Sequence, residues 1–213
     1  MISIHTVSIR TTPRSALVRW CSAAEIERSA RYLQSDDQLR CLAAAALRRA
    51  ILSDLVAVAP EALRFTTNAH GRPALMWPAS GLDFNCAHGG DLVGLAVALD
   101  QQVGLDIEPL AHAGRVAEVA ASVFTEAERA SAAGDAKMLL EYWVRKEAVL
   151  KLLGTGLATP PLDIEVHLDA PRWSDGRPLP GQVQVRELAG HLLAVAGSQA
   201  RTAVSYVEAT LSG

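Results

Sequence analysis

Two carboxylates in the middle of the chain are spaced so that together they could bind a metal ion. Asp106 and Glu108 lie in the segment Val-Gly-Leu-Asp-Ile-Glu at residues 103–108, and Pro109 follows directly. An extended strand points alternate side chains to opposite faces, so these two acids share one face. Like charges so close repel unless a cation lies between them, and Mg²⁺ prefers such oxygen ligands. The alternative is a polar strand edge that faces solvent.

A second group of chemically capable residues lies in the segment at residues 141–151, whose composition favours a helix. Trp143, Glu147 and Lys151 are spaced four residues apart and therefore share one helix face. The carboxylate of Glu147 and the ammonium group of Lys151 can thus reach the same point in space. The alternative is an ordinary surface ion pair, which stabilises a helix by roughly a few tenths of a kcal/mol.

A histidine between two short predicted strands is the third candidate. His88 lies in the segment Asn-Cys-Ala-His-Gly-Gly-Asp at residues 85–91, which we expect to form a loop. Because glycines follow it, its imidazole can approach a phosphate with little steric hindrance. The alternative is a turn histidine exposed to water.

The composition excludes several classes of protein. The chain has 213 residues, 50% of them hydrophobic and 20% charged, which is typical of a globular protein with a large core. Its 20 basic and 23 acidic residues give a net charge of −3, so we expect neither a nucleic acid nor a membrane as partner. Three widely spaced cysteines and the lack of an apolar leader favour a cytoplasmic location.

The elements that must position these residues follow from hydrophobic spacing and turn residues. Ser35 or Asp36 is a predicted N-cap for a long helix that ends before Pro60, and Gly154 is a natural helix terminator. Residues 66–75 form a turn-rich stretch. We expect further helices at residues 23–32 and 116–153, and strands at residues 2–9, 82–86, 92–99, 103–108, 164–168, 183–187, 192–196 and 202–207.

A faint internal repeat indicates two similar halves. The tripeptide Gly-Arg-Pro occurs at residues 71–73 and again at 176–178. Each copy precedes a similar apolar strand, at residues 94–99 and 191–197. This offset predicts a duplication, with the two halves joined near residues 100–103.

Taken in order, these segments resemble the Sfp-type 4'-phosphopantetheinyl transferase family. The resemblance covers roughly residues 28–160 and implies an α+β fold: a pseudo-dimer of two similar α/β lobes, each a small mainly antiparallel sheet packed on helices. We expect lobes at residues 1–102 and 103–213, with the active site in the cleft between them. The segments that carry it are Gly-Arg-Pro at 71–73, F-N-x-x-H at 84–88, V-G-L-D-I-E at 103–108, F-T-x-x-E at 124–128 and W-x-x-K-E-A-x-x-K at 143–151.

The resemblance also implies a reaction. The 4'-phosphopantetheine arm of coenzyme A would pass to a serine of an apo carrier protein, with Mg²⁺ as cofactor and adenosine 3',5'-bisphosphate as the product. This is the holo-[acyl-carrier-protein] synthase type of activity, expected from a monomer. One alternative is a non-catalytic module that binds coenzyme A and carrier proteins, although binding alone would not need metal carboxylates. Another is a different Mg²⁺-dependent phosphoryl-transfer enzyme, although the sequence lacks a P-loop and an extended basic groove.

Roles for the acidic residues and one lysine follow from the family pattern. Asp106, Glu108 and Glu147 correspond to its metal carboxylates. Glu147 is also the candidate general base for the serine, directly or through water, although a carboxylate bound to metal is a poor base at neutral pH. Lys151 corresponds to the lysine beside the pyrophosphate and can stabilise the departing charge.

The family pattern also suggests which residues bind coenzyme A. Arg72 and His88 match phosphate-contacting positions, and Arg28 and Arg40 are expected near the 3'-phosphate. Lys146 belongs to the same motif as Glu147, but it should face a different side of the helix.

The sequence departs from the family at three positions. Ala87 stands where many members carry a serine, and Cys41 stands where a threonine is common. Arg72 replaces a frequent lysine, and a planar guanidinium group can still bind a phosphate there. All three departures bear on the affinity for coenzyme A rather than on the class of reaction.

Overall fold

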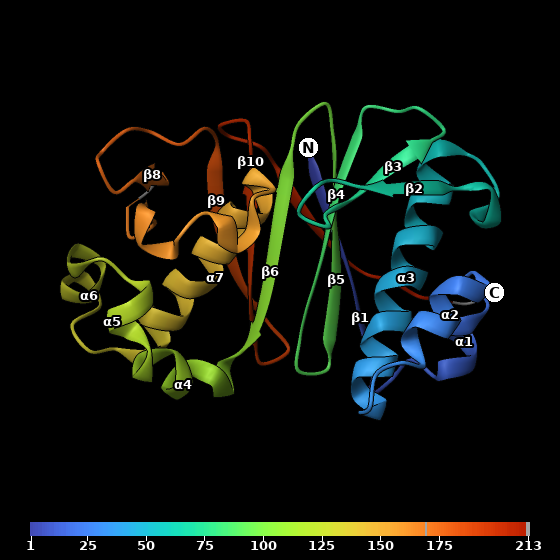
Figure 1. The fold of residues 1–213 in the computed structure, drawn as a ribbon, viewed down its shortest axis with the longest axis horizontal. Coiled ribbons are helices and arrows are strands. Elements are labelled where there is room, and N and C mark those ends of the chain that lie inside the picture. Colours follow the sequence, from blue (N-terminus) through green and yellow to red (C-terminus); the bar gives the residue numbers. More distant parts are fainter. Residues whose placement is uncertain (169, 212–213) are drawn as a thin grey trace.

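The computed structural model describes residues 1–168 and 170–211. Figure 1 shows strands in the middle of the molecule and helices on two opposite sides, with α1–α3 on one side and α4–α7 on the other. The expected α+β class is confirmed. No helix in the described ranges is both long and apolar enough to cross a membrane.

The first sheet contains four strands in the order β11-β1-β5-β4. Strand β5 pairs antiparallel with both β1 and β4, while β11 pairs parallel with β1. A separate hairpin, β2–β3, follows the long helix α3. The elements of this region are β1 (Ile2–Ser8), α1 (Arg14–Val18), α2 (Ala23–Ser29), α3 (Ser35–Val56), η1 (Pro60–Ala62), β2 (Arg64–Thr67), β3 (Pro73–Trp77), β4 (Leu82–Gly89), β5 (Leu92–Leu99) and β11 (Val204–Glu208).

The second sheet contains three antiparallel strands in the order β6-β10-β9. A short hairpin, β7–β8, follows the long helix α7. The elements of this region are β6 (Val103–Pro109), η2 (Leu110–His112), α4 (Ala113–Glu118), α5 (Ala120–Val123), α6 (Glu126–Ala132), α7 (Ala136–Leu153), η3 (Gly156–Ala158), η4 (Pro161–Asp163), β7 (Ile164–Glu165), β8 (Arg172–Trp173), β9 (Gln182–Leu188) and β10 (His191–Gly197).

The two regions repeat one arrangement, so the expected pseudo-dimer of similar lobes is confirmed. Each has a first strand, a long helix, a small hairpin and then two antiparallel strands. The sheet orders β1-β5-β4 and β6-β10-β9 correspond element by element. The lobe limits at residues 1–102 and 103–213 stay a prediction, and β11 lies in the first sheet although it follows the second in sequence.

Three hydrophobic cores stack the lobes into four layers. One core joins α3 to the first sheet, and another joins α7 to the second sheet. The third lies between the sheets, where Ile4 and Ala96 meet Leu105 and Leu193. Strands β5 and β10 are therefore covered on both faces, which explains why their sequences are continuous apolar runs. Figure 1 shows these layers, with β5 and β6 side by side at the centre.

Side chains of β4 join the two sheets where β4 meets β6. The backbone N–H of Leu105 donates to Asn85 Oδ1 at 3.0 Å, and that of Val103 donates to Asp83 Oδ2 at 2.8 Å. These side chains of β4 thus provide hydrogen-bond acceptors for two backbone N–H groups of β6.

Several local expectations were wrong; for example, the strand expected at residues 164–168 ends at Glu165. Helix α3 begins at Ser35, with Gln34 as N-cap and no capping side chain; Asp36 lies in the first turn instead, where a negative charge stabilises the helix dipole. The helix expected at residues 23–32 ends at Ser29. His88 lies in β4 rather than in a loop, because β4 continues to Gly89 in register with β5.

Candidate active site

The contact between α7 and β6 brings the acidic and basic motifs together. It is close because residue 104 is glycine: a Cβ there would lie 2.0 Å from the carbonyl oxygen of Ala148. The helix can therefore rest on the strand itself. Strand β6 contributes Asp106 and Glu108, and α7 contributes Glu147 and Lys151, as the sequence predicts.

Asp106 is the most buried acid of the group, with 6% of its surface exposed. Its Oδ1 accepts a hydrogen bond from Lys151 Nζ at 2.6 Å. Its Oδ2 is buried and has no hydrogen-bond partner in the described part of the chain. Because buried polar atoms are nearly always satisfied in native proteins, this oxygen indicates a place for a bound group.

Glu108 lies two residues further along the same face of β6. Its Oε2 lies 2.7 Å from Nδ1 of His112, which belongs to the short helix η2. The side chain is only partly buried, with 25% of its surface exposed. It can therefore exchange this partner for another without leaving a buried charge unpaired.

Glu147 faces both acids of β6 from α7. Burial raises the pKa of Glu147, and the negative charges of Asp106 and Glu108 raise it further, while Lys151 opposes the change. Within residues 1–168 and 170–211, no three acid, histidine or cysteine side chains form a ready-made metal cluster. The raised pKa of Glu147 and the unpartnered oxygen of Asp106 both fit a cation that would bind among these carboxylates.

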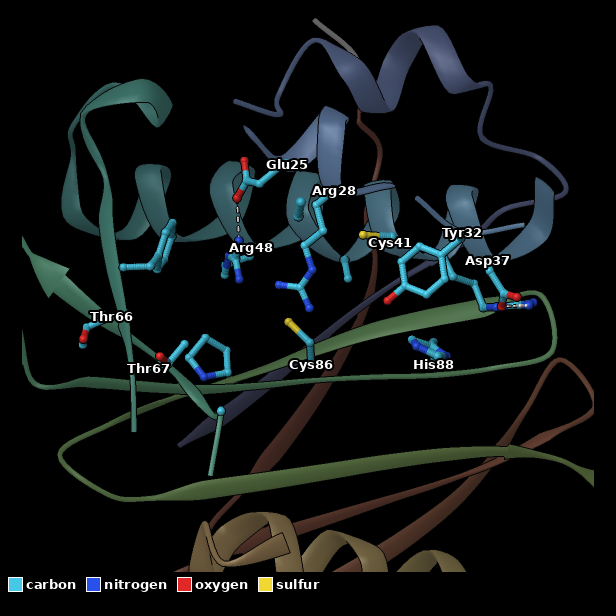
Figure 2. A pocket seen from close by; sticks show the side chains of 16 residues that line it. Glu25, Arg28, Tyr32, Asp37, Cys41, Arg48, Thr66, Thr67, Cys86 and His88 are labelled. Carbon is cyan, nitrogen blue, oxygen red and sulfur yellow. Dashed lines mark hydrogen bonds and ion pairs between the residues drawn. The ribbon is translucent and has the colours of Figure 1, made fainter. Parts of the chain in front are cut away.

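A cavity of about 620 Å³ opens beside this centre, between α2, α3, the β2–β3 hairpin and β4. Figure 2 shows Arg28 extending from α2 into the cavity, above Cys86 of β4. Arg28 forms no ion pair with a carboxylate in the described residues, so its charge is available to a ligand. The other charged or polar residues that line the cavity are Glu25, Tyr32, Asp37, Arg40, Cys41, Arg48, Thr66, Thr67 and His88.

Two further arginines of this cavity already have protein partners. Arg40 donates to Asp37 Oδ1 at 2.5 Å and to the carbonyl of Gly90 at 2.6 Å. Arg48 pairs with Glu25 at 2.5 Å, and Figure 2 marks this contact. Both guanidinium groups are thereby held at the wall of the cavity.

His88 of β4 lines the same cavity. Loss of surrounding water lowers the pKa of His88, and the positive charges of Arg40 and Lys151 lower it further. The negative charge of Asp37, which also lines the cavity, opposes this lowering of the pKa. A neutral ring at neutral pH can donate a hydrogen bond to a phosphate without a net charge of its own.

Arg72 is bound to the protein on several sides. Its Nη2 donates to Asp83 Oδ2 at 2.6 Å and to the carbonyl of Val103 at 2.7 Å. Its Nη1 donates to the carbonyls of Lys151 and Leu152 at the end of α7. A phosphate contact by Arg72 stays a prediction, and the guanidinium would have to share or exchange these partners to make it.

A smaller cavity of about 210 Å³ adjoins the first one. Gly71, Pro73 and Cys86 line both cavities, and Lys151 lines the smaller one. The space beside the arginines of the first lobe therefore borders on Lys151, whose Nζ lies 2.6 Å from Asp106.

Sequence reasoning missed several lining residues. Cys86, Arg48 and the β2–β3 hairpin residues Thr66 and Thr67 line the main cavity. The α3 residues carried a signal, because positions 40, 41, 44, 45 and 48 follow helical spacing and all line this cavity. The hairpin carried none, because its position over α3 depends on the tertiary fold.

Two family models match the chain, one in each half. The model described as "4'-phosphopantetheinyl transferase superfamily" matches residues 102–199. The model described as "4'-phosphopantetheinyl transferase, N-terminal" matches residues 12–100. The two matches divide the chain close to the junction that the internal repeat predicts.

Characterised relatives with similar sequences come from distant organisms. The 4'-phosphopantetheinyl transferase HetI of Nostoc sp. is 31% identical over 169 residues, which is 72% of this chain and 71% of the relative. The L-aminoadipate-semialdehyde dehydrogenase-phosphopantetheinyl transferase of Schizosaccharomyces pombe is 31% identical over 163 residues, 68% of this chain and 63% of the relative. The 4'-phosphopantetheinyl transferase AcpT of Escherichia coli is 32% identical over 111 residues, 50% of this chain and 55% of the relative.

Proposed function

We propose that this chain, which belongs to the 4'-phosphopantetheinyl transferase superfamily, transfers the 4'-phosphopantetheine group of coenzyme A to a serine of an apo carrier protein. The oxygen of the serine attacks the β-phosphorus of the pyrophosphate, and the bond from this phosphorus to the bridging oxygen breaks. The serine proton is released, and adenosine 3',5'-bisphosphate leaves. The observation that carries the proposal is the Oδ2 atom of Asp106, which is buried and has no hydrogen-bond partner among the described residues. It lies near Glu147, whose pKa is raised.

Asp106, Glu108 and Glu147 would hold the divalent cation, for which we propose Mg²⁺. Oxygen-only ligands of this kind suit a hard cation. When bound, the cation supplies charge neutralisation on the pyrophosphate, which lowers the barrier to attack by the serine.

Glu147 and Lys151 perform the proton and charge chemistry in this proposal. Glu147 would accept the proton of the serine hydroxyl, directly or through a water. Burial and the neighbouring acids raise its pKa when no cation is bound, and a bound cation would oppose that change. Lys151, whose Nζ lies 2.6 Å from Asp106, places a positive charge where the leaving phosphate gains its negative charge.

The arginine-lined cavity would bind the nucleotide end of coenzyme A. Arg28 has a guanidinium group free for the 3'-phosphate, while Arg40 and His88 line the same cavity. Arginine suits this role because its planar donors match phosphate oxygens. The smaller cavity, which shares Gly71, Pro73 and Cys86 with this one, borders on Lys151.

The activity would be of the holo-[acyl-carrier-protein] synthase type, carried out by a monomer in the cytoplasm. Three free cysteines agree with a reducing compartment. The relatives' names include transferases for different acceptors, and their aligned parts cover between 55% and 71% of each protein compared above. We therefore propose a carrier-protein serine as the acceptor.

The test is intact-mass spectrometry of an apo carrier protein incubated with the full chain, coenzyme A and Mg²⁺. The expected result is a mass gain of one phosphopantetheine and release of adenosine 3',5'-bisphosphate, both lost with EDTA. Asp106→Asn should lose the gain, whereas Asp175→Asn removes only an exposed surface pair with Arg177 and should keep it. Coenzyme A binding without any mass gain on several carriers would contradict the proposal and favour a binding module. Release of inorganic phosphate would favour another phosphoryl-transfer reaction.

A further inference from the structure

Lys146, the residue directly before Glu147, is fully buried. Its side chain is 0% exposed, and so is that of Glu128 on α6, whose Oε2 lies 2.8 Å from Lys146 Nζ. The lysine faces away from the carboxylate centre, which confirms that the two neighbours in the motif point to different sides of α7. Buried charges are retained only when paired and hydrogen-bonded.

Both members of this pair hold backbone groups of other segments. Lys146 Nζ donates to the carbonyl of Pro161 at 2.7 Å and also to that of Ile164. Glu128 accepts from the backbone N–H of Thr125 at 2.9 Å and from that of Val166 at 2.9 Å. The pair therefore ties three parts of the second lobe together: the start of α6, the middle of α7 and the segment at residues 161–166.

This network has directional contacts that an apolar core lacks. A buried ion pair is not by itself evidence of stability, because the loss of hydration can exceed the gain from attraction. Hydrogen bonds to fixed carbonyls do, however, hold the lysine head at one point. Successive residues of a helix are rotated by about 100°, so a fixed Lys146 also fixes the direction of Glu147.

We propose that the Lys146–Glu128 pair is a positioning device for the active site, which sets the rotation of α7 so that Glu147 and Lys151 face Asp106. The inference rests on the proposed transferase activity. Gly104 already fixes how closely α7 approaches β6. The contact at Gly104 does not by itself set the rotation of α7 about its own axis. The Lys146–Glu128 pair restrains that rotation from another side of the helix.

The experiment separates positioning from stability by a double-mutant cycle. The variants are Lys146→Met, Glu128→Gln and the two combined. Removing one charge leaves the other buried and unpaired, so we expect the Tm of each single variant to fall. The combined variant has no buried charge and should recover most of that loss. Lys137→Met is the matched control, because Lys137 lies on the same helix and pairs with Glu187 at the same distance, 2.8 Å, but in an exposed position.

Three readouts are measured on each folded variant: kcat, KM for coenzyme A and the rise in Tm that Mg²⁺ causes. In the combined variant, kcat for carrier modification should stay about 10²-fold below wild type, since small misplacements of catalytic groups have effects of this size. Its KM for coenzyme A should change less than about threefold, because the arginine cavity belongs to the other lobe. The Mg²⁺-dependent rise in Tm should also shrink in this variant and persist in Lys137→Met.

A combined variant with wild-type kcat and a wild-type Mg²⁺ response would overturn the inference, as would an equal loss in Lys137→Met. If Lys146→Met does not fold, the combined variant still decides. If the wild-type chain itself modifies no carrier, the proposed function fails, and the Mg²⁺ response of the variants decides the positioning role alone.

Discussion

The two lobes have the same order of elements but different chemistry at their long helices. Helix α3 of the first lobe carries Arg40 and Arg48 on the wall of a cavity that Arg28 of α2 also lines. Helix α7 of the second lobe carries Glu147 and Lys151 beside a strand with two acids. In the proposed function, one scaffold would therefore bind an anion in one copy and a cation in the other.

The difference begins with how each helix meets its sheet. In the second lobe α7 lies close against β6 at Gly104. In the first lobe α3 packs through larger side chains, where Leu42 and Leu47 meet Phe84 and Leu95. A helix held off by side chains leaves space for a cavity, whereas a helix on the backbone itself brings functional groups within bonding distance.

Glu147→Gln tests the proposed chemistry of the second lobe, and it has the largest expected effect. Loss of the negative charge should reduce kcat by about 10³-fold or more, since bound-cation catalysis contributes several kcal/mol. The rate is measured by intact mass at saturating coenzyme A, with circular dichroism to check the fold. Glu141→Gln on the same helix, which removes an i,i+4 pair with Arg145, should keep wild-type turnover. Unchanged turnover in Glu147→Gln would contradict the proposed role of Glu147.

Gly104→Ala should show that the close helix contact is specific to the second lobe. The new Cβ would meet the backbone of Ala148 and Leu152, so α7 must move. We expect a loss of about 3 kcal/mol in the free energy of unfolding, measured in urea, as for a strongly overpacked core. Gly114→Ala, where a Cβ meets no atom within 4 Å in α4, should instead gain about 0.5–1 kcal/mol. Equal stability of both variants would contradict this account of the contact.

Arg28→Ala tests the anion-binding role of the first lobe. Loss of charge-assisted hydrogen bonds worth about 1.5–3 kcal/mol should raise KM for coenzyme A by about 10- to 100-fold, with kcat nearly constant. Steady-state kinetics over a range of coenzyme A concentrations measures both parameters. Arg31→Ala, which removes an exposed arginine near Glu27, is the control and should change neither. A fall in kcat alone would place Arg28 in the chemistry of the other lobe.

The smallest expected effect is a pH dependence at His88. The pKa of this histidine is lowered, so the ring is neutral at neutral pH and gains a positive charge only as the pH falls below its ordinary value of 6.5. A protonated ring attracts phosphate, so KM for coenzyme A should fall by about threefold on acidification, a value typical of exposed charge pairs. His88→Asn should remove this part of the pH profile. Identical profiles for the two proteins would exclude a role for His88 in binding.

Part of this molecule could be predicted from local sequence. Alternation on β6 places Asp106 and Glu108 on one face, and four-residue spacing on α7 places Glu147 and Lys151 together. The apolar runs at residues 92–99 and 191–197 predicted strands, because a strand buried on both faces needs no polar alternation. These features depend on neighbours in the chain, and local rules describe them well.

The rest depended on contacts between distant segments. The partners of Arg72 at Asp83 and Val103 exist only because β4 meets β6. The partner of Lys146 lies on another helix, and no spacing rule connects it with Glu128. His88 became part of a strand because β5 offered a pairing partner up to Leu92. Local propensity cannot contain this information.

Strand β11 has a consequence for the order of folding. Val204 pairs with Ile2 although about 200 positions separate them, and such non-local pairing slows folding because a large loop must close first. During synthesis β1 leaves the ribosome early, but its outer neighbour is made only after the whole second lobe. Until then the backbone groups on that edge of β1 lack their final partner, so the nascent chain carries an open strand edge while the active-site strand β6 and helix α7 are being made.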